Sequence, residues 1–301
     1  MVPTRVYPLE APFDLASTLG ILSRGAGDPT LRLARGRAWR ATRTADGPAT
    51  VTIVQDAGRL AAEAWGPGAE RALDDLPRVL GLDTGPFRPA DHHRLVTELA
   101  RRLPGVRITR NAAILDALIP AILEQKVTGD EARRAWRGLI ARFGEPAPGP
   151  PEFLLRLPPT PATLAALPYY TFHPFGIERR RAELIRRVAG RAAWFEAITT
   201  LPMRDAHARL LAVPGIGPWT TAEVAVRALG DPDAVSVGDF HLPNLVAYAL
   251  AGEPRADDTR MLELLAPWHG ERAHVIRLLE LSGIRAPRYG PRLAPRRIET
   301  A

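Results

Sequence analysis

The N-terminal part of the chain alternates hydrophobic and polar positions, which is the two-residue period of a β-strand with one buried face. Residues 37–44 and 49–54 alternate in this way on either side of Asp46-Gly47, a dipeptide that favours a tight turn between antiparallel strands. Residues 59–65 show the same pattern. The sequence therefore predicts a small antiparallel sheet near the N-terminus.

Two segments that flank these strands carry apolar residues at helical spacing instead. They cover residues 12–23 and residues 69–80, and the second ends at Gly81. Residues 1–88 are therefore expected to form an N-terminal α+β domain in which helices pack on the sheet.

After residue 88 the hydrophobic pattern is helical throughout. A capping box, Thr128-Gly129-Asp130-Glu131, opens one helix, and Gly144 ends it. Helices are predicted over residues 91–102, 111–127, 128–143, 163–167, 177–191, 204–211, 219–229, 242–250, 257–265 and 271–281. We expect an α+β protein with a mostly helical region over residues 89–284 and a basic, flexible tail over residues 285–301.

Composition narrows the class of protein. The chain has 301 residues, 46% hydrophobic and 24% charged, which is typical of a globular protein and not of a disordered chain. It has no cysteine, which excludes disulfides, thiolate-bound zinc, iron–sulfur clusters and a cysteine nucleophile. The most apolar run, residues 112–123, is interrupted by Asp116 and Pro120 and is too short to span a bilayer. No secretory signal is visible, so we expect a soluble, cytoplasmic, nucleoid-associated protein.

The charge balance favours a polyanionic partner. The net charge is +7 and the isoelectric point is near 10.5. Almost all of the positive charge is arginine, and Lys126 is the only lysine. Chemistry that needs a side-chain amine is therefore limited to one position.

A glycine-rich turn joins two helices within residues 204–229. The turn is Pro214-Gly215-Ile216-Gly217, and its glycines let the backbone adopt positive φ and approach a partner closely. It leads into a helix N-terminus, where free N–H groups favour an anion such as a phosphate. The same pattern also fits an ordinary helical hairpin with no ligand.

An aspartate follows this hairpin at the start of the next helix. Asp239 lies 22 positions after Gly217, in the stretch Asp239-Phe240-His241. Taken alone it is a plausible helix N-cap. Together, the hairpin and the aspartate resemble the helix-hairpin-helix DNA glycosylase superfamily, in which a Gly/Pro-rich hairpin precedes an aspartate in this setting. Pro12-Phe13-Asp14 with Leu19-Gly20, and residues 121–128, resemble its 3-methyladenine DNA glycosylase II branch.

The resemblance implies a monofunctional enzyme. Bifunctional relatives carry a lysine two residues after the second hairpin glycine, where this chain has Trp219, and an indole cannot form a Schiff base. Lys126 lies in a different helix and is a poor substitute. The expected reaction removes an alkylated purine from duplex DNA and leaves an abasic site. Asp239 would stabilise the oxocarbenium-like sugar, and an already cationic base would leave without a second acid.

The resemblance also assigns a base pocket. Trp219 forms one wall, and Phe240 lies beside the catalytic carboxylate. Glu223 occupies a position where the family often has an aromatic residue, so it either lines the pocket or is a solvated helix charge. The segment 278–280 lacks the aromatic of the opposite wall. An aromatic insertion, residues 169–175, either replaces that wall, reaches into DNA, or plugs the helical core.

DNA and ion contacts follow from the same resemblance. The expected DNA-binding residues are Gly215, Ile216, Gly217, Thr220, Gln125 and Lys126. Gln125 and Lys126 lie in the wedge region, where either Lys126 contacts a phosphate or Gln125 fills the gap left by the extruded base. The backbone carbonyls of Leu211, Val213 and Ile216 would hold Na⁺ or K⁺, with no other cofactor required.

Two alternatives remain open at this point. The first is a glycosylase for another lesion, an oxidised or deaminated purine. The second is a protein that binds damaged DNA without catalysis. In each case we expect a monomer whose partner is double-stranded DNA containing a damaged base. Asp239 argues against the second, because a buried anion beside a phosphate-binding hairpin would repel the DNA backbone.

Overall fold

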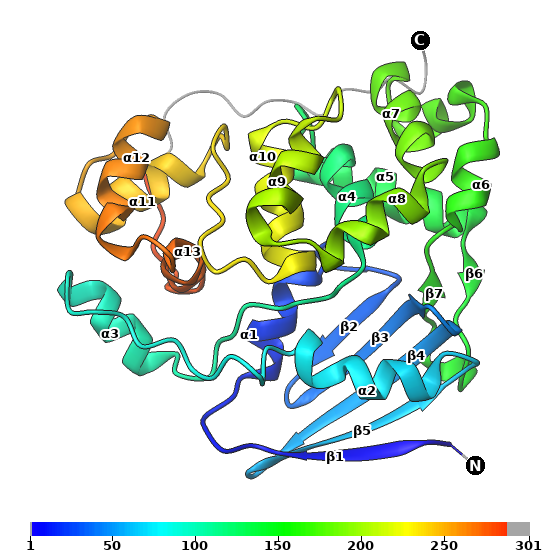
Figure 1. The fold of residues 1–301 in the computed structure, drawn as a ribbon, viewed down its shortest axis with the longest axis horizontal. Helices are drawn as coiled ribbons and strands as arrows, with labels where there is room; N and C mark the ends of the chain where they lie inside the picture. The colour runs from blue at the N-terminus through cyan, green and yellow to red at the C-terminus, as the bar shows by residue number, and fades with distance from the viewer. Residues whose placement is uncertain (1, 288–301) are drawn as a thin grey trace.

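The computed structural model describes residues 2–287 and consists of an antiparallel sheet with a larger helical part above it (Figure 1). The five-stranded sheet has the order β1-β5-β4-β3-β2. Its strands are β1 (Thr4–Pro8), β2 (Leu31–Ala34), β3 (Arg37–Thr44), β4 (Gly47–Asp56) and β5 (Arg59–Trp65). Helix α1 (Leu15–Leu19), the short 3₁₀ helix η1 (Gly20–Leu22) and helix α2 (Ala69–Val79) complete the N-terminal unit. The predicted α+β class is confirmed.

The register of the sheet follows its hydrophobic alternation. The predicted hairpin is present, but its two turn residues are Ala45 and Asp46, one position earlier than expected: Thr44 pairs with Gly47, which has positive φ and begins β4. Val51 and Ile53 of β4 are buried together with Leu73 and Leu76 of α2. The sequence did not predict β1 and β2, the two short edge strands.

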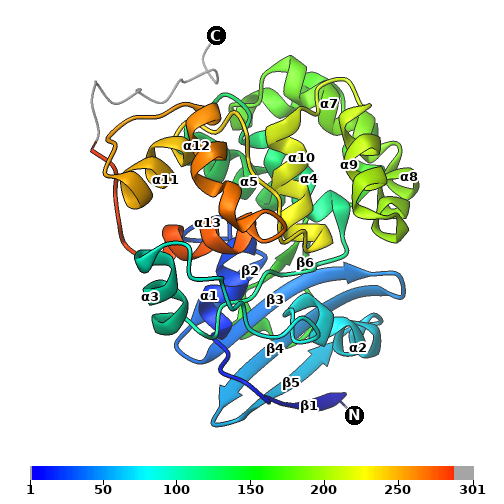
Figure 2. The ribbon, with the colours of Figure 1, turned by 60° about the vertical axis from the view of Figure 1, so that its left-hand side comes forward.

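The helical part is arranged in two groups of helices (Figure 2). Its α-helices are α3 (Arg94–Arg102), α4 (Ile114–Leu123), α5 (Gly129–Phe143), α6 (Pro161–Ala166), α7 (Arg179–Ala189), α8 (Ala192–Glu196), α9 (Met203–Leu211), α10 (Pro218–Val224), α11 (Leu242–Ala251), α12 (Asp258–Leu265) and α13 (Arg272–Leu281). Short elements are η2 (Pro151–Phe153), η3 (Tyr169–Phe175), η4 (Ala197–Thr200), the π-helical η5 (Ala225–Leu229), η6 (Ala266–Trp268), β6 (Glu145–Pro146) and β7 (Arg156–Leu157).

The predicted helical region, residues 89–284, contains two separate hydrophobic clusters. The first surrounds α4, in which every residue except Asp116 is buried. The second joins α3 to α11, α12 and α13, although α3 is far from them in the sequence. Residues 230–241 connect the two clusters and carry Asp239. The candidate catalytic residue therefore lies at their junction.

The aromatic insertion forms η3 and packs inward. Phe172 is fully buried, and Phe175 lies so close to Gly138 of α5 that a Cβ there would be 2.5 Å from its ring. Tyr170 is exposed. Of the three roles considered for this insertion, the structure supports the plug over the helical core.

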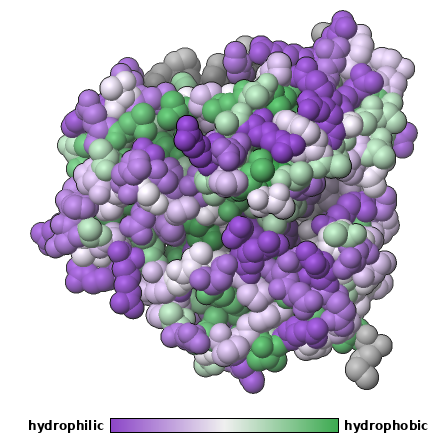
Figure 3. Space-filling view, viewed as in Figure 1, coloured by the Kyte–Doolittle hydropathy of each residue, from purple (hydrophilic) through white to green (hydrophobic). Residues whose placement is uncertain are grey.

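The surface gives no sign of a membrane-spanning segment. Hydrophilic side chains cover most of the face shown in Figure 3, with smaller hydrophobic patches between them. Over residues 2–287, no helix combines the length and the apolar character needed to cross a bilayer. Most of the basic tail predicted over residues 285–301 lies outside the described residues.

Candidate active site

The predicted hairpin is present between α9 and α10, but its two glycines adopt different conformations. Gly215 has φ +97°, which favours glycine, and a Cβ there would lie 3.0 Å from Leu184. Gly217 is extended, with φ −100°, so the expectation of positive φ is right for Gly215 and wrong for Gly217. A Cβ on Gly217 would meet no atom within 4 Å. Gly217 therefore faces open space, where another backbone can approach.

Side chains from neighbouring helices hold the turn from inside. The Gln125 Nε2 amide donates to the Gly215 carbonyl at 3.0 Å and to the Thr220 Oγ1 hydroxyl at 2.9 Å. Arg187 donates to the Pro214 carbonyl at 2.6 Å. The side chains of Ile216 and Thr220 are buried. The side chains of these two residues therefore support the hairpin from the core, and the DNA contact that we expect of them, through the backbone of the turn, stays a prediction.

The carboxylate of Asp239 makes contacts in two directions. Its Oδ1 accepts hydrogen bonds from the backbone N–H groups of His241 at 2.7 Å and Leu242 at 2.9 Å, at the start of α11. Its Oδ2 accepts a hydrogen bond of 3.0 Å from Nε1 of Trp219 on α10. Asp239 thus caps its own helix and also faces the hairpin. Three N–H donors fix a half-buried carboxylate at the junction of the two clusters.

The loop that carries Asp239 is attached to the second cluster as well. The N–H of Gly238 donates to both carboxylate oxygens of Asp258 on α12, at 3.1 and 3.0 Å. Gly238 has φ +93°, a conformation that favours glycine. The backbone therefore turns sharply immediately before Asp239, with one side bound to α12 and the other to α10.

The two aromatic residues assigned to the base pocket differ in their surroundings. Trp219 is half-buried, with its indole N–H committed to Asp239. Phe240 is 78% exposed. Its ring packs edge-on against the ring of His241, with 4.9 Å between the two ring centroids. Phe240 thus lies beside the carboxylate in the chain but projects outward, and no enclosed wall forms around it.

Glu223 is neither a solvated helix charge nor a free pocket group. Its Oε2 pairs with Nη1 of Arg227 at 2.5 Å, and its Oε1 accepts a hydrogen bond of 2.6 Å from the Ser236 hydroxyl. The side chains of Glu223 and Arg227 are 13% and 16% exposed. Both of the roles considered from the sequence therefore give way to a third, a largely buried ion pair.

The wedge region contributes one anchored and one exposed residue. The Gln125 amide is occupied by the hairpin, which leaves Lys126 as the exposed cation of this segment. Lys126 has φ +54°, a left-handed conformation uncommon for a residue with a side chain. Between the two roles considered, this arrangement favours a phosphate contact by Lys126.

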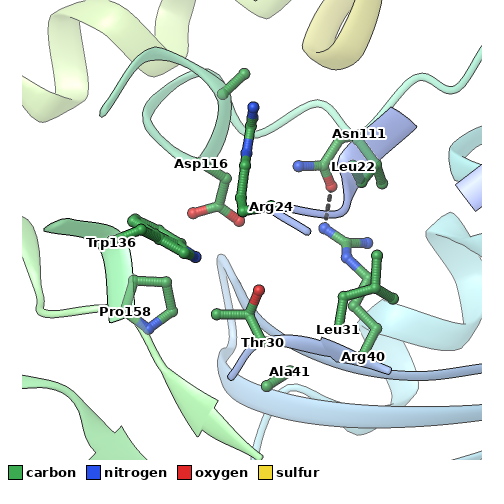
Figure 4. Close-up of a pocket in the computed structure, with 11 residues that line it drawn as sticks. Leu22, Arg24, Thr30, Leu31, Arg40, Ala41, Asn111, Asp116, Trp136 and Pro158 are labelled. Carbon is green, nitrogen blue, oxygen red and sulfur yellow. Dashed lines mark hydrogen bonds between the residues drawn. The ribbon is translucent and has the colours of Figure 1, made fainter. Parts of the chain in front are cut away.

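A small cavity lies elsewhere, between the sheet and α4 (Figure 4). It has a volume of about 30 Å³, and its polar lining comes from Asp116, Arg24, Arg40, Asn111 and Thr30. Arg40 donates a hydrogen bond to Asn111. Burial raises the pKa of Asp116 and lowers the pKa of Arg24 and Arg40. One signal for this site is visible in the sequence, where Asp116 interrupts an apolar run.

The described residues contain no cluster of three or more His, Asp or Glu side chains suited to a metal ion. At the hairpin, the Val213 carbonyl accepts a hydrogen bond of 2.9 Å from the Ile216 N–H. A carbonyl oxygen has two lone pairs, so Val213 keeps one for a further partner.

Comparison with known proteins agrees with this geometry. No family model matches the chain. It is 31% identical over 142 residues to a Mycobacterium tuberculosis protein named "probable bifunctional transcriptional activator/DNA repair enzyme AlkA", a match covering 47% of the chain and 28% of that protein. It is 25% identical over 181 residues to the DNA-3-methyladenine glycosylase of Bacillus subtilis, covering 56% of the chain and 57% of the relative. The matched segments therefore span between about a quarter and somewhat over half of these relatives.

The fold similarity extends over almost the whole molecule. The structure of a 3-methyladenine DNA glycosylase from Archaeoglobus fulgidus superimposes with a TM-score of 0.75 at 18% identity, covering 92% of this chain and 98% of that one. The fold and the sequence therefore point to proteins of the same kind. The sequence relatives and this structural neighbour are named as DNA repair enzymes or 3-methyladenine glycosylases. The chain therefore has the fold of this 3-methyladenine DNA glycosylase, and about half of its length is similar in sequence to DNA repair proteins of that kind.

Proposed function

We propose that this protein is a monofunctional DNA glycosylase that removes alkylated purines of the 3-methyladenine type from double-stranded DNA and acts as a monomer. The observation that carries the proposal is the orientation of Asp239. Its Oδ2 is bonded to Trp219 of the hairpin helix, so the carboxylate lies next to the turn that would hold a DNA strand. The names of the relatives supply the reaction class and the type of lesion.

Binding would begin at the turn. Gly217 lies open to an approaching backbone, and α10 begins directly after it. A phosphate can bind at such a helix N-terminus independently of base sequence. Lys126, exposed beside the hairpin, adds a positive charge for the same backbone.

Base release would depend on Asp239. The target nucleotide must leave the stack for its glycosidic bond to be reached. As that bond breaks, its electrons leave with the alkylated base, which becomes neutral, and C1′ of the sugar becomes electron-poor. The fixed carboxylate stabilises this developing charge, and water adds to C1′ and releases its proton to the solvent. The product is an abasic site with an intact backbone.

Trp219 can serve two purposes at once. Its N–H lies in the plane of the indole and is used to hold Asp239. The faces of the ring lie above and below this plane, so the hydrogen bond does not block them. A face can stack on a cationic purine, with an attraction of about 1 to 2 kcal/mol. Since an indole has no nucleophilic amine, no Schiff base can form at this position, which supports hydrolysis without strand cleavage.

We also propose a monovalent cation, Na⁺ or K⁺, at the hairpin. The carbonyl oxygens of Leu211, Val213 and Ile216 are neutral, hard ligands of the kind that such ions accept. When bound, the ion would add positive charge beneath a DNA phosphate. No other cofactor is required by the proposal.

The test uses a set of duplexes that each contain one damaged base. The protein is incubated with each duplex, the released bases are identified by mass spectrometry, and strand integrity is checked before and after alkali. We expect release of alkylated purines and strand cleavage only after alkali. Release of oxidised or deaminated purines alone would contradict the proposed lesion class. Tight binding without release from any duplex would contradict catalysis.

A further inference from the structure

Two side-chain hydrogen bonds connect the hairpin helix to the loop that carries Asp239. Trp219 binds the Asp239 carboxylate at 3.0 Å, and Glu223, four residues later on α10, accepts from the Ser236 hydroxyl at 2.6 Å. Residues four apart lie on the same face of a helix. One face of α10 therefore holds the loop at two points.

Ser236 in turn fixes the backbone of Asp239. The Ser236 carbonyl accepts a hydrogen bond of 3.1 Å from the Asp239 N–H, which closes a turn over residues 236–239. The hydroxyl of the same serine is bonded to Glu223. A displacement of Ser236 would therefore be passed directly to the backbone of the candidate catalytic residue.

Glu223 is itself held rigidly by Arg227. The guanidinium Nη1 binds the carboxylate at 2.5 Å and the Glu223 carbonyl at 3.2 Å, while Nε donates to the carbonyl of Ile21 at 3.0 Å. A largely buried carboxylate needs such a partner, because an unpaired buried charge is costly. Arg227 thus fixes Glu223 against the N-terminal unit as well as against its own helix.

The backbone around Arg227 is anchored too. It belongs to the π-helical segment η5, and its carbonyl is available for another partner because it lies in the last turn of the helix. The Arg227 carbonyl accepts from the Asn111 N–H at 3.1 Å, and the Ala228 carbonyl accepts from the Ala112 N–H at 2.8 Å. The network thus extends from the segment before α4 to Asp239.

We infer that Glu223, held by Arg227, is a positioning residue that orients Asp239 through Ser236, and that it affects the rate of base release but not the choice of lesion. This inference rests on the proposed glycosylase function. Both oxygens of Glu223 are already engaged, so the carboxylate is not free to pair with a cationic base. Its effect reaches the sugar only through Asp239.

The test measures how well Asp239 is placed. Duplexes carry either a neutral tetrahydrofuran abasic analogue or a pyrrolidine analogue whose ring nitrogen is positively charged, as the sugar is during bond cleavage. The ratio of the two dissociation constants reports the attraction of a correctly placed carboxylate for the cation. Single-turnover base release is measured in parallel on duplexes with 3-methyladenine and with 7-methylguanine.

Ser236→Ala and Glu223→Gln are expected to reduce both the pyrrolidine preference and the rate of base release by about 10-fold, since small misplacements of a catalytic group are costly. The decrease should be equal on both lesions, and the affinity for the neutral analogue should stay the same. Ser236→Thr keeps the hydroxyl and should restore the wild-type values. Glu183→Gln is the matched control, because it breaks an exposed Arg–Glu pair on α7.

Two results would overturn the inference. In one, both variants keep the full pyrrolidine preference and the full rate. In the other, Glu223→Gln changes the ratio of rates between the two lesions, which would place Glu223 against the base. A wild-type protein that releases no base and shows no pyrrolidine preference would contradict the proposed function itself. If Ser236→Ala unfolds, as its melting temperature would show, Glu223→Gln and Ser236→Thr still decide the question.

Discussion

Asp239 and Asp116 are two carboxylates in contrasting regions of the molecule. Asp239 lies at the junction of the helical clusters, half-buried, with its oxygens held by three N–H donors. Asp116 lines a cavity of about 30 Å³ between the sheet and α4. Three arginines near Asp116 favour its charged form, yet burial outweighs them and raises its pKa. The more enclosed of the two is therefore the less suited to act as an anion.

The difference shows what makes a carboxylate useful in this fold. The cavity at Asp116 holds about two water molecules at most and has no room for a purine. Asp239, by contrast, is bonded through Oδ2 to Trp219 on the helix that follows the hairpin, where we propose that a DNA strand binds. Position relative to the hairpin, and not depth of burial, identifies the candidate catalytic group.

The largest expected effect separates the two carboxylates directly. Asp239→Asn should lower the single-turnover rate of base release by about 100- to 1000-fold, because the charge that stabilises the sugar cation is lost. Its affinity for DNA should be unchanged or higher. Asp116→Asn should keep the rate within about 2-fold of wild type, since Asp116 lines the cavity between the sheet and α4 and not the hairpin site. A normal rate in Asp239→Asn would contradict the comparison.

A smaller effect is expected when the donor to Asp239 is removed. Trp219→Phe keeps an aromatic face but loses the indole N–H, so base release should fall by about 10-fold, the equivalent of one hydrogen bond to a charged group. Trp194→Phe, in α8, is the control and should leave the rate unchanged. A decrease in Trp219→Phe that appears only in DNA affinity would show that the N–H does not act through Asp239.

The two hairpin glycines should respond differently to alanine. Gly217→Ala places a methyl group in open space, so the protein should fold normally and bind every duplex several-fold more weakly. Gly215→Ala forces a side chain into positive φ and should cost about 1 to 2 kcal/mol of unfolding free energy. Melting temperatures and dissociation constants for undamaged DNA check both expectations. Loss of binding to one lesion alone would contradict a phosphate contact at Gly217.

The smallest effect concerns stability at Asp116. Since the pKa of Asp116 is raised by folding, the unfolding free energy is highest when this group is protonated and falls as pH rises through its folded pKa. Asp116→Asn should remove this contribution, so the variant should be more stable than the wild type at pH 8. Urea unfolding at pH 5 and pH 8 measures the difference between variant and wild type. An Asn variant that is less stable at pH 8 would show that the arginines dominate.

Local signals in the sequence predicted much of this structure. The capping box at Thr128 and the turn before Gly47 act over a few residues; the capping box is present as predicted, and the turn lies one position earlier than expected. Asp239 was singled out because its spacing from the hairpin resembles that of helix-hairpin-helix DNA glycosylases, and its catalytic role stays a prediction. The fold class and the main helices followed in the same way.

Contacts between distant segments account for what the sequence did not predict. The edge strands β1 and β2 are short, and most of β1 is exposed, so neither gives a strong hydrophobic pattern. The second cluster depends on α3 packing against helices about 150 residues later. The bond between Glu223 and Ser236 depends on how the loop folds back over α10, which no spacing rule describes.

The loop before α11 is fastened at both sides, with Gly238 bound to α12 and Asp239 bound to α10. Asp239 therefore keeps its distance from the hairpin only while the two helical clusters keep theirs. The packing between the two clusters thus sets the distance from Asp239 to the hairpin. The contacts of α3 with α11 and α13 contribute to that distance, although they lie away from the hairpin.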